Sequence, residues 1–256
     1  SSAASDVYKR QMQHGTPGEN GLLQGYFEML GIPHSGCSAF VSTVAFDKYS
    51  CKSYLRDIDY VKLAPDAFVR KGMDVNAFAA KAVERLGLPL FVKPTDGGSS
   101  FGITKVKEAD GLVPAVNYAF SEGPAVVVEK SIKGREFTCA AYLDGGEVKA
   151  LPVIEIITEN EYFDYDAKYN GHSQEVCPAQ ISEELSSEIQ KITEKIYAHL
   201  GCNGIVRMDY ISAEDGLYFL EVNTIPGMTS ASLVPKMVRA AGMDMTAFLT
   251  TVIENS

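Results

Sequence analysis

The sequence has few cysteines, and their arrangement does not suggest a cross-link. Five occur in 256 residues, they are widely separated, and none forms a C-x-x-C pair. A disulfide framework usually needs an even set of cysteines, and zinc sites usually need closely paired ones. We therefore expect reduced and mostly buried thiols, at Cys37, Cys51, Cys139, Cys177 and Cys202.

Basic residues are also scarce. Lys and Arg number 23 against 33 Asp and Glu, which gives a formal net charge of −10 and a pI near 4.9. Nucleic acids are held by broad basic surfaces, which this composition cannot easily supply. We therefore expect no nucleic-acid partner, and an anionic ligand would depend on a few locally placed lysines and arginines.

Long apolar runs are missing as well. No stretch approaches the ~18 to 20 residues of a membrane span. The opening S-S-A-A-S-D-V-Y-K-R-Q lacks the apolar centre of a secretory signal. We expect no membrane insertion and a cytoplasmic location.

Two common nucleotide motifs are absent, but a glycine-rich loop is present. No G-K-[ST] closes a Walker A loop, and no G-x-G-x-x-G follows a predicted strand. Instead, the strand L-P-L-F-V-K-P carries Lys93 near its end and leads into T-D-G-G-S-S-F-G at 95–102. Such a loop exposes backbone N–H groups to an anion. An ordinary surface loop explains this motif equally well when it is taken alone.

The rest of the pattern predicts helices and strands that do not alternate regularly. Apolar periodicity, N-terminal caps and terminal glycines predict helices over 19–30, 74–86 and 183–200. Short apolar runs predict strands over 88–92, 124–130, 136–143, 147–156, 204–211 and 217–223. This order is typical of an α+β protein with mostly antiparallel sheets. The change of pattern predicts a boundary near residue 130.

The last two predicted strands form the most informative segment, because polar residues occupy positions expected to be apolar. Arg207 and Asp209 share one face of the first strand, and Glu221 and Asn223 share one face of the second. If the hairpin folds about Asp215, Asp209 lies opposite Glu221 and Arg207 lies opposite Asn223. Facing carboxylates repel unless a cation lies between them, and these oxygen ligands suit Mg²⁺.

Several of these features also have plainer interpretations. The hairpin charges fit a solvated sheet face, and a bulge at Gly216 would change the register. The strand that ends over 129–132, with Glu136 beyond it, suits a ligand edge, but an ordinary strand exit with snorkelling lysines fits as well. The irregular stretch D-Y-D-A-K-Y-N-G suits a lid over a ligand.

Several motifs occur together in one order, and on them the chain resembles the D-alanine–D-alanine ligases of the ATP-grasp superfamily from about His14 onward. These motifs are H-G-T-P-G-E-N-G at 14–21, L-G-I-P-H-S-G at 30–36, F-D-K at 46–48, F-V-K-P-T-D-G-G-S-S-F-G at 91–102, F-D-Y-D-A-K-Y at 163–169, R-M-D at 207–209 and E-V-N-T-I-P-G-M-T-S-A-S-L-V-P at 221–235.

The resemblance implies an ATP-grasp fold, in which two α+β subdomains clasp ATP. Residues 1–36 would form a polar leader and a remnant of an N-terminal α/β substrate domain. A central subdomain would cover 37–130, and a C-terminal subdomain with the metal and catalytic site would cover 131–256.

The resemblance also implies an ATP site with residues from both subdomains. Lys48 and Lys93 would hold phosphates, Lys168 would reach the γ-phosphate and Glu136 would take the ribose. The implied ATP-binding set is Lys48, Lys93, Ser99, Ser100, Glu129, Lys130, Ile132, Glu136, Lys168 and Leu220. The implied ligands of two Mg²⁺ ions, with Mn²⁺ as a substitute, are Asp209, Glu221 and Asn223.

The reaction implied by the resemblance joins two D-alanines for peptidoglycan precursor synthesis. ATP phosphorylates one D-alanine carboxylate, the amine of a second D-alanine attacks the acyl phosphate, and phosphate leaves. Arg207 would stabilise the tetrahedral oxyanion. The implied catalytic residues are Arg207, Ser99, Tyr169 and Lys168. The implied substrate-binding residues are His14, Glu19, Gly227, Ser232 and Leu233.

Two questions stay open at this point. Tyr169 favours an amine nucleophile over a hydroxy acid, but D-serine is an alternative second substrate. For His14, an isolated surface histidine is the plainer interpretation.

The chain departs from the family at its start. The family's glycine-rich strand–loop–helix unit, which carries a glutamate for the first substrate, has no match, and residues 1–11 are polar where an apolar strand is expected. One hypothesis is an active ligase whose missing part is missing only from this chain. The other is a folded nucleotide-binding fragment with little activity. A homodimer, usual in the family, is in doubt because it relies partly on that unit.

Overall fold

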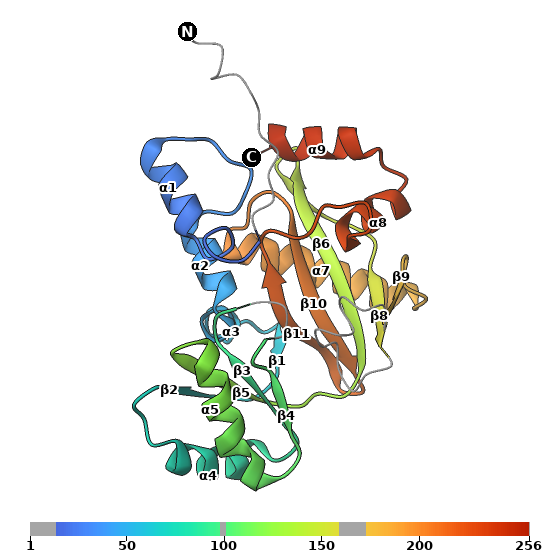
Figure 1. The fold of residues 1–256 in the computed structure, drawn as a ribbon. Coiled ribbons are helices and arrows are strands. Elements are labelled where there is room, and N and C mark those ends of the chain that lie inside the picture. The colour runs from blue at the N-terminus through green and yellow to red at the C-terminus, as the bar shows by residue number, and fades with distance from the viewer. Residues whose placement is uncertain (1–13, 98–100, 159–172, 256) are drawn as a thin grey trace.

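Two β-sheets organise the chain in the computed structural model, which describes residues 14–97, 101–158 and 173–255 (Figure 1). The large sheet has the order β1-β11-β10-β6-β8-β9, with β7 paired to β6, and the small sheet has the order β2-β5-β3-β4. The large-sheet strands are β1 (Lys62–Leu63), β6 (Arg135–Asp144), β7 (Glu147–Ala150), β8 (Ile154–Thr158), β9 (Ser173–Val176), β10 (Val206–Ala213) and β11 (Gly216–Asn223). The small-sheet strands are β2 (Asp66–Arg70), β3 (Leu90–Pro94), β4 (Thr104–Val106) and β5 (Ala125–Lys130).

Strand directions agree with the predicted α+β class. β1 pairs with β11 in parallel, and the other strand pairs of the described residues are antiparallel. The helices are α1 (Leu22–Leu30), α2 (Ala39–Phe46), α3 (Lys48–Leu55), α4 (Val75–Leu86), α5 (Leu112–Glu122), α7 (Glu183–Leu200), α8 (Leu233–Ala240) and α9 (Met245–Glu254), with a 3₁₀ turn at Ala109–Gly111.

The three predicted helices are present, and their end signals act as expected. Ser182 caps α7 by accepting a hydrogen bond from Leu185 N, and Gly201 ends it with a left-handed φ of 67°. Asp74 caps α4 in the same way. Helix α2 was not predicted, because A-F-V-S-T-V-A-F is rich in β-branched residues and too short to show a helical period.

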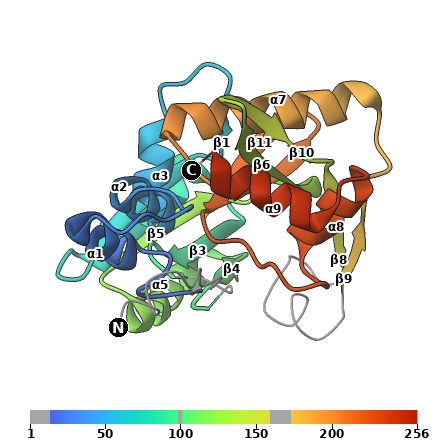
Figure 2. The same cartoon turned by 90° about the horizontal axis from the view of Figure 1, so that it is seen from above.

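Each face of the large sheet has its own hydrophobic core. Alternate residues of β6 and β10 pack with α2, α3 and α7 on one face, and Ala140 and Tyr142 of β6 pack with α8 and α9 on the other. Figure 2 shows α7 and α9 on opposite sides of this sheet. Helices α4 and α5 cover the small sheet with a third core.

The core of the large sheet also contains residues that come before the small sheet in the chain. Cys37, Val41, Cys51 and Leu55 lie in the core of the large sheet, although they precede the small sheet in sequence. The chain then passes from the small sheet to the large sheet between the end of β5 and the start of β6.

One predicted strand is split in two. The run E-V-K-A-L-P-V-I-E-I forms β7 and β8 instead of a single strand over 147–156. Pro152 has no N–H for a ladder hydrogen bond, and it lies between the two strands. As a result, β7 pairs with one end of β6 and β8 pairs with the other.

The cysteines agree with the expectation of reduced and mostly buried thiols. All five cysteines are free, and four of them are buried. Among the described residues, no helix combines the length and the apolar character that a bilayer span requires.

Substitution of Phe248 tests the packing between the large sheet and α9. Its ring is fully buried and lies edge-on to Tyr142, with centroids 4.9 Å apart. Phe248→Ala should lower the free energy of unfolding by about 3–5 kcal/mol, because it leaves a cavity. Urea unfolding measures this, and Ile253→Ala on the same helix, where the side chain is 59% exposed, should change it by less than about 0.5 kcal/mol. Equal effects would contradict the packing described.

Candidate functional site

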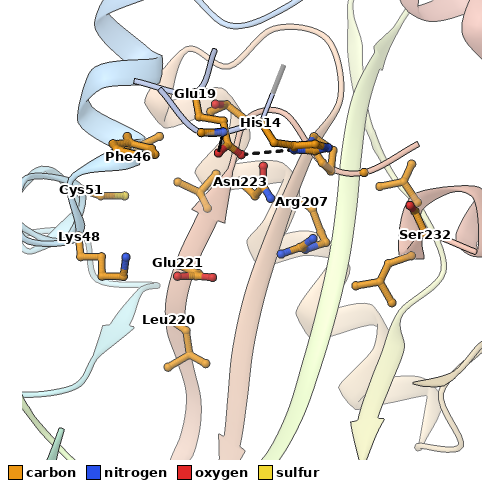
Figure 3. Close-up of a pocket in the computed structure, with 18 of the residues that line it drawn as sticks. His14, Glu19, Phe46, Lys48, Cys51, Arg207, Leu220, Glu221, Asn223 and Ser232 are labelled. Atoms are coloured by element: carbon orange, nitrogen blue, oxygen red, sulfur yellow. Dashed lines mark hydrogen bonds and ion pairs between the residues drawn. The ribbon is translucent and has the colours of Figure 1, made fainter. Parts of the chain in front are cut away.

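A cleft of about 590 Å³ opens beside the β10–β11 hairpin (Figure 3). Its walls come from the segment before α1, the junction of α2 and α3, the hairpin, and the loop that leads into α8. The predicted site residues that line it are His14, Glu19, Lys48, Arg207, Leu220, Glu221, Asn223, Gly227, Ser232 and Leu233.

The hairpin has the predicted register at the cleft. Asp209 pairs with Glu221 and Arg207 pairs with Asn223. Nearer the turn, Tyr210 pairs with Phe219, so Leu220 is the extra residue of a bulge. The bulge therefore lies at Leu220 and not at Gly216.

This bulge allows β11 to serve two environments. Phe219 and Val222 both pack in the core beneath α7, while Leu220 and Glu221 between them both line the cleft. Strict alternation from Phe219 would point Glu221 into that core. The extra residue therefore keeps a carboxylate out of the core and adds an apolar side chain to the cleft.

Arg207 and Asp209 form a bidentate ion pair on the cleft face of β10. Arg207 donates from Nε to Asp209 Oδ1 at 3.0 Å and from Nη2 to Oδ2 at 2.9 Å. Thr138 Oγ1 donates to Asp209 Oδ1 at 2.6 Å. Burial opposes the charge of Arg207, but Asp209, with help from Glu221 and Glu19, raises the pKa of its guanidinium.

The same face supplies oxygen donors that fit a magnesium ion. Asp209 and Glu221 offer carboxylate oxygens, and Asn223 offers an amide oxygen that also accepts from Ile225 N at 2.9 Å. No cluster of three His, Cys, Asp or Glu that could hold a metal occurs within the described ranges. Two carboxylates and an amide suit Mg²⁺, which usually takes its other ligands from water and phosphate.

The opposite end of the cleft is suited to an anion. Ser232, Leu233 and Val234 line it at the N-terminus of α8, where unpaired N–H groups and the helix dipole favour negative charge. A Cβ on Gly227 would lie 2.8 Å from Ser232 Oγ, so any side chain at this position would require the Ser232 hydroxyl to move.

His14 and Glu19 form the rim of the cleft. His14 Nδ1 lies 3.8 Å from Glu19 Oε1, and Gly15 N donates to Glu19 Oε2 at 2.6 Å. The contact with the backbone fixes the carboxylate, and His14 lies beside it on the exposed rim.

Lys48 connects helix α3 to the glycine-rich loop. Asp47 caps α3 by accepting a hydrogen bond from Ser50 N, which places Lys48 in the first turn. Lys48 Nζ donates to Gly97 O at 2.8 Å, and its backbone N donates to Thr95 O at 2.7 Å. This lysine therefore lies where the loop begins.

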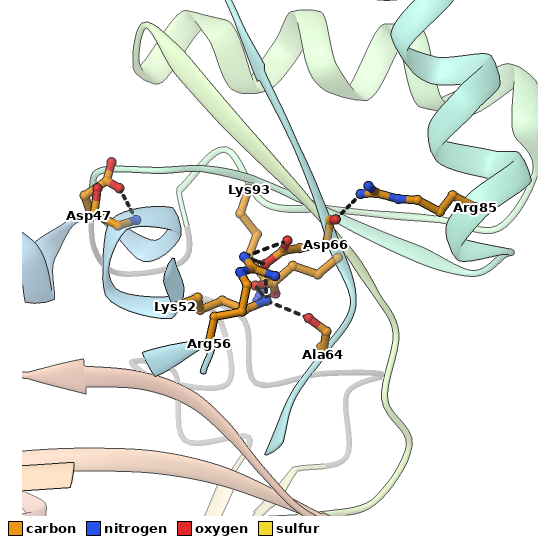
Figure 4. A network of polar contacts seen from close by, with 9 residues as sticks. Asp47, Lys52, Arg56, Ala64, Asp66, Arg85 and Lys93 are labelled. Carbon is orange, nitrogen blue, oxygen red and sulfur yellow. Dashed lines mark hydrogen bonds and ion pairs between the residues drawn. The ribbon is translucent and has the colours of Figure 1, made fainter. Parts of the chain in front are cut away.

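A buried row of charges lies beside the cleft, between α3 and the small sheet (Figure 4). Glu129 binds Lys93 through Oε2 and Lys52 through Oε1, each at 2.7 Å. Lys52 Nζ lies 3.0 Å from Asp66 Oδ2, and Arg56 Nη2 lies 3.1 Å from Asp66 Oδ1. The charges alternate in sign along the row.

The row sets the ionisation of its members. Burial by itself would raise the pKa of the Glu129 carboxyl, but Lys93 and Lys52 lower it to about 2. Burial likewise opposes the charge of Lys93, and Glu129, followed by Glu221 and Glu136, raises its pKa. Lys93 therefore lies in the field of carboxylates from both sheets.

The remaining predicted residues lie elsewhere. Lys93, Glu129, Lys130, Ile132, Glu136 and Asp209 do not contribute to the cleft lining. Lys130 is exposed at the end of β5, and Ile132 is half-buried just beyond it. Ser99, Ser100, Lys168 and Tyr169 lie outside the described residues.

Sequence reasoning missed several residues of the site. Lys52 and Asp66 are buried charges within an ordinary helix and strand, and the one signal is that Lys52 lies one helical turn after Lys48. Cys51 lines the cleft, but burial raises the pKa of its thiol to about 12, so it stays protonated. Glu175 of β9 also lines the cleft and pairs with Lys236 of α8.

The depressed pKa of Glu129 makes a prediction about acid stability. Because the folded value lies below the ordinary 4.5, the ion pairs stabilise the fold above about pH 4.5, and this contribution is lost as the pH falls toward 2. By pH 3, about 2 kcal/mol should be lost. In Glu129→Gln, the free energy of unfolding in urea should therefore fall by about 2 kcal/mol less than in wild type between pH 5 and pH 3.

Glu84→Gln is the matched control, since Glu84 is an exposed glutamate of α4. Its free energy of unfolding should fall between pH 5 and pH 3 by as much as that of wild type. If Glu129→Gln also loses as much as wild type, the pKa of Glu129 is not depressed in the folded protein.

Comparison with known proteins shows the family of the chain. A family model described as the D-ala D-ala ligase C-terminus matches residues 55–254. Two proteins named D-alanine--D-alanine ligase, from Parabacteroides distasonis and Porphyromonas gingivalis, are each 50% identical to the chain over 94% of its length and 73% of theirs.

Solved structures extend the agreement to the fold. VanG D-Ala:D-Ser ligase from Enterococcus faecalis has a TM-score of 0.86 and 36% identity, over 94% of this chain and 70% of that one. D-alanine--D-alanine ligase from Bacillus anthracis has a TM-score of 0.82 and 38% identity, over 94% of this chain and 77% of that one. The resemblance inferred from the motifs is confirmed, and the chain belongs to the D-alanine–D-alanine ligase family of ATP-dependent ligases with the ATP-grasp fold.

Proposed function

We propose that the protein joins two D-alanines into D-alanyl-D-alanine for peptidoglycan precursor synthesis and converts ATP to ADP and phosphate. The observation that carries this proposal is the cleft itself. Oxygen donors, a paired arginine and a helix N-terminus face one space there. This is the set that phosphoryl transfer followed by acyl transfer requires.

In the proposed reaction, ATP lies between the two sheets. Lys48 and Lys93 bind its phosphates, Leu220 packs on the base, and Glu136 takes the ribose. Lys48 is suited to this role because it already contacts the backbone at the start of the glycine-rich loop. Glu129, Lys130 and Ile132 are proposed for the adenine edge, and Ser99, Ser100 and Lys168 for the phosphates.

The metal ligands in this proposal are Asp209, Glu221 and Asn223. Bound Mg²⁺ would supply neutralisation of the phosphate oxygens during transfer. Asp209 is already shared with Arg207, so the ion and the arginine would divide its oxygens.

The chemistry has two steps. The carboxylate of the first D-alanine attacks the γ-phosphorus of ATP, which gives an acyl phosphate and ADP. The amine of the second D-alanine then attacks the acyl carbon, and phosphate leaves with the bonding electron pair. The bidentate pair with Asp209 fixes the guanidinium of Arg207, which would stabilise the oxyanion of the tetrahedral adduct.

The second D-alanine would lie at the α8 end of the cleft. Gly227, Ser232 and Leu233 would receive it, with its carboxylate at the helix N-terminus. His14 and Glu19 on the rim, with Ser99 and Tyr169, would orient the first substrate. We also propose a cytoplasmic location, because free and mostly buried thiols are typical of reducing compartments.

D-Serine is a second candidate for the incoming amino acid. It is favoured by the similarity to a D-Ala:D-Ser ligase, although the two relatives with 50% identity are named for D-alanine alone. Mass spectrometry of products formed from equal D-alanine and D-serine would give the preference.

ADP formation tests the proposal. With ATP and Mg²⁺, ADP should appear only when D-alanine is present, with one dipeptide formed for each ADP. ATP binding without D-alanine-dependent turnover would instead support a nucleotide-binding fragment. Turnover with another acid and none with D-alanine would indicate a different carboxylate–amine ligase.

Glu221 is the sharper test of the metal site. Glu221→Gln should lower the D-alanine-dependent rate at least ~100-fold and raise the Mg²⁺ concentration needed for half the maximal rate, because a charged ligand is lost. Asp215→Asn removes a carboxylate from the exposed turn of the same hairpin and should change the rate by less than about twofold. Unchanged turnover in Glu221→Gln would rule out this ligand assignment.

A further inference from the structure

Lys52 lies at the centre of the buried charge row and takes no part in the function proposed above. The row runs Arg56, Asp66, Lys52, Glu129, Lys93, with N–O distances between 2.7 and 3.1 Å. It contains three cations and two carboxylates, so one positive charge is in excess. At its two ends, the Arg56 side chain is 43% exposed and the Lys93 side chain is 17% exposed.

Lys52 cannot bind a ligand itself. The residue is 1% exposed, and an ammonium has three N–H donors. Nζ reaches Glu129 Oε1 at 2.7 Å, Ala64 O at 2.9 Å and Asp66 Oδ2 at 3.0 Å. Two hydrogen bonds and an ion pair, around a side chain that is almost closed to solvent, leave no position for a ligand.

Glu129 is shared between two lysines, with one oxygen for each. Lys52 takes Oε1 and Lys93 takes Oε2. Within the described ranges, the Lys93 ammonium donates one hydrogen bond, and it goes to this carboxylate. One oxygen of the Glu129 carboxylate therefore holds Lys93 in place, while Lys52 balances part of the charge of the same carboxylate.

We propose that Lys52 is a positioning residue. It neutralises part of the Glu129 charge through the carboxylate oxygen that Lys93 does not use, so that Lys93 is held by the carboxylate but keeps its charge available to the phosphates of ATP. This inference rests on the proposed role of Lys93 as a phosphate ligand. Lys52 acts through Glu129 and Lys93 and touches no substrate.

Removal of Lys52 would change the charge balance without leaving a bare carboxylate. Asp66 would keep Arg56, and Glu129 would keep Lys93. The row becomes two neutral pairs, the excess positive charge disappears, and Glu129 attracts Lys93 alone. Lys93 is then bound more tightly inside the protein and less available to a ligand.

The experiment measures the dissociation constants of ATP and adenosine for the full chain and for Lys52→Met. Adenosine lacks phosphates, so it reports distortion of the pocket alone. We expect the constant for ATP to rise about tenfold, as for a weakened contact to a charged group. The constant for adenosine should change by less than about twofold.

Arg56→Met is the matched control. It removes the same charge from the same row but leaves both partners of Glu129 in place, so ATP affinity should stay within about twofold of wild type. An unchanged ATP constant in Lys52→Met, or equal weakening of ATP and adenosine, would overturn the proposal. If the wild-type chain does not bind ATP, the proposed function fails rather than this inference.

A second variant tests the proposal in case Lys52→Met does not fold. Lys52→Met combined with Asp66→Asn deletes one cation and one carboxylate, and it keeps the pair of Glu129 and Lys93. The same tenfold loss for ATP, with adenosine unchanged, is expected. Circular dichroism confirms folding in each case, and wild-type ATP affinity in a folded double variant would overturn the proposal.

Discussion

The arrangement of the site depends on one constraint, which is that the β10–β11 hairpin must serve a hydrophobic core and a charged cleft at once. Its core face packs beneath α7, and its other face carries Arg207, Asp209 and Glu221. Simple alternation cannot satisfy both faces along β11, because two neighbouring residues are needed in the cleft. The bulge at Leu220 resolves this conflict, and the pairing beyond it brings the carboxylates opposite each other.

Opposed carboxylates repel, and the structure limits that repulsion with neighbouring groups. Arg207 and Thr138 together satisfy Asp209, while the charge of Glu221 contributes to the raised pKa of Lys93. The same logic holds in the buried row, where every carboxylate has two basic partners. In both clusters the charged groups lie next to groups of opposite sign, and each cluster holds a cation, Arg207 or Lys93, in a fixed position.

Much of this arrangement is predictable because local signals agree with the final structure. The helix over 183–200 has a cap, a period and a terminal glycine, and its bounds match. The facing of Asp209 and Glu221 was predicted, but it depends on the bulge, because the register at the turn, where Ala213 pairs with Gly216, would place Asp209 opposite Leu220. The position of the bulge does not follow, since Leu220 resembles any strand residue until the packing of Phe219 and Val222 is known.

Lys52 was beyond prediction for a related reason. A lysine in the middle of a helix is usually solvated, and nothing in K-Y-S-C-K-S-Y-L marks its burial. Its partners Asp66 and Glu129 come from strands that are far apart in sequence, and their meeting depends on the pairing of β2 with β5.

The split of the predicted strand at Pro152 could have been anticipated from the missing N–H, whereas the change of partner along β6 could not.

Helix α3 contacts both sheets. Cys51 and Leu55 lie in the core of the large sheet, while Lys52 forms ion pairs with residues of the small one. One stretch of this helix therefore joins an apolar contact with the large sheet to an ionic contact with the small one.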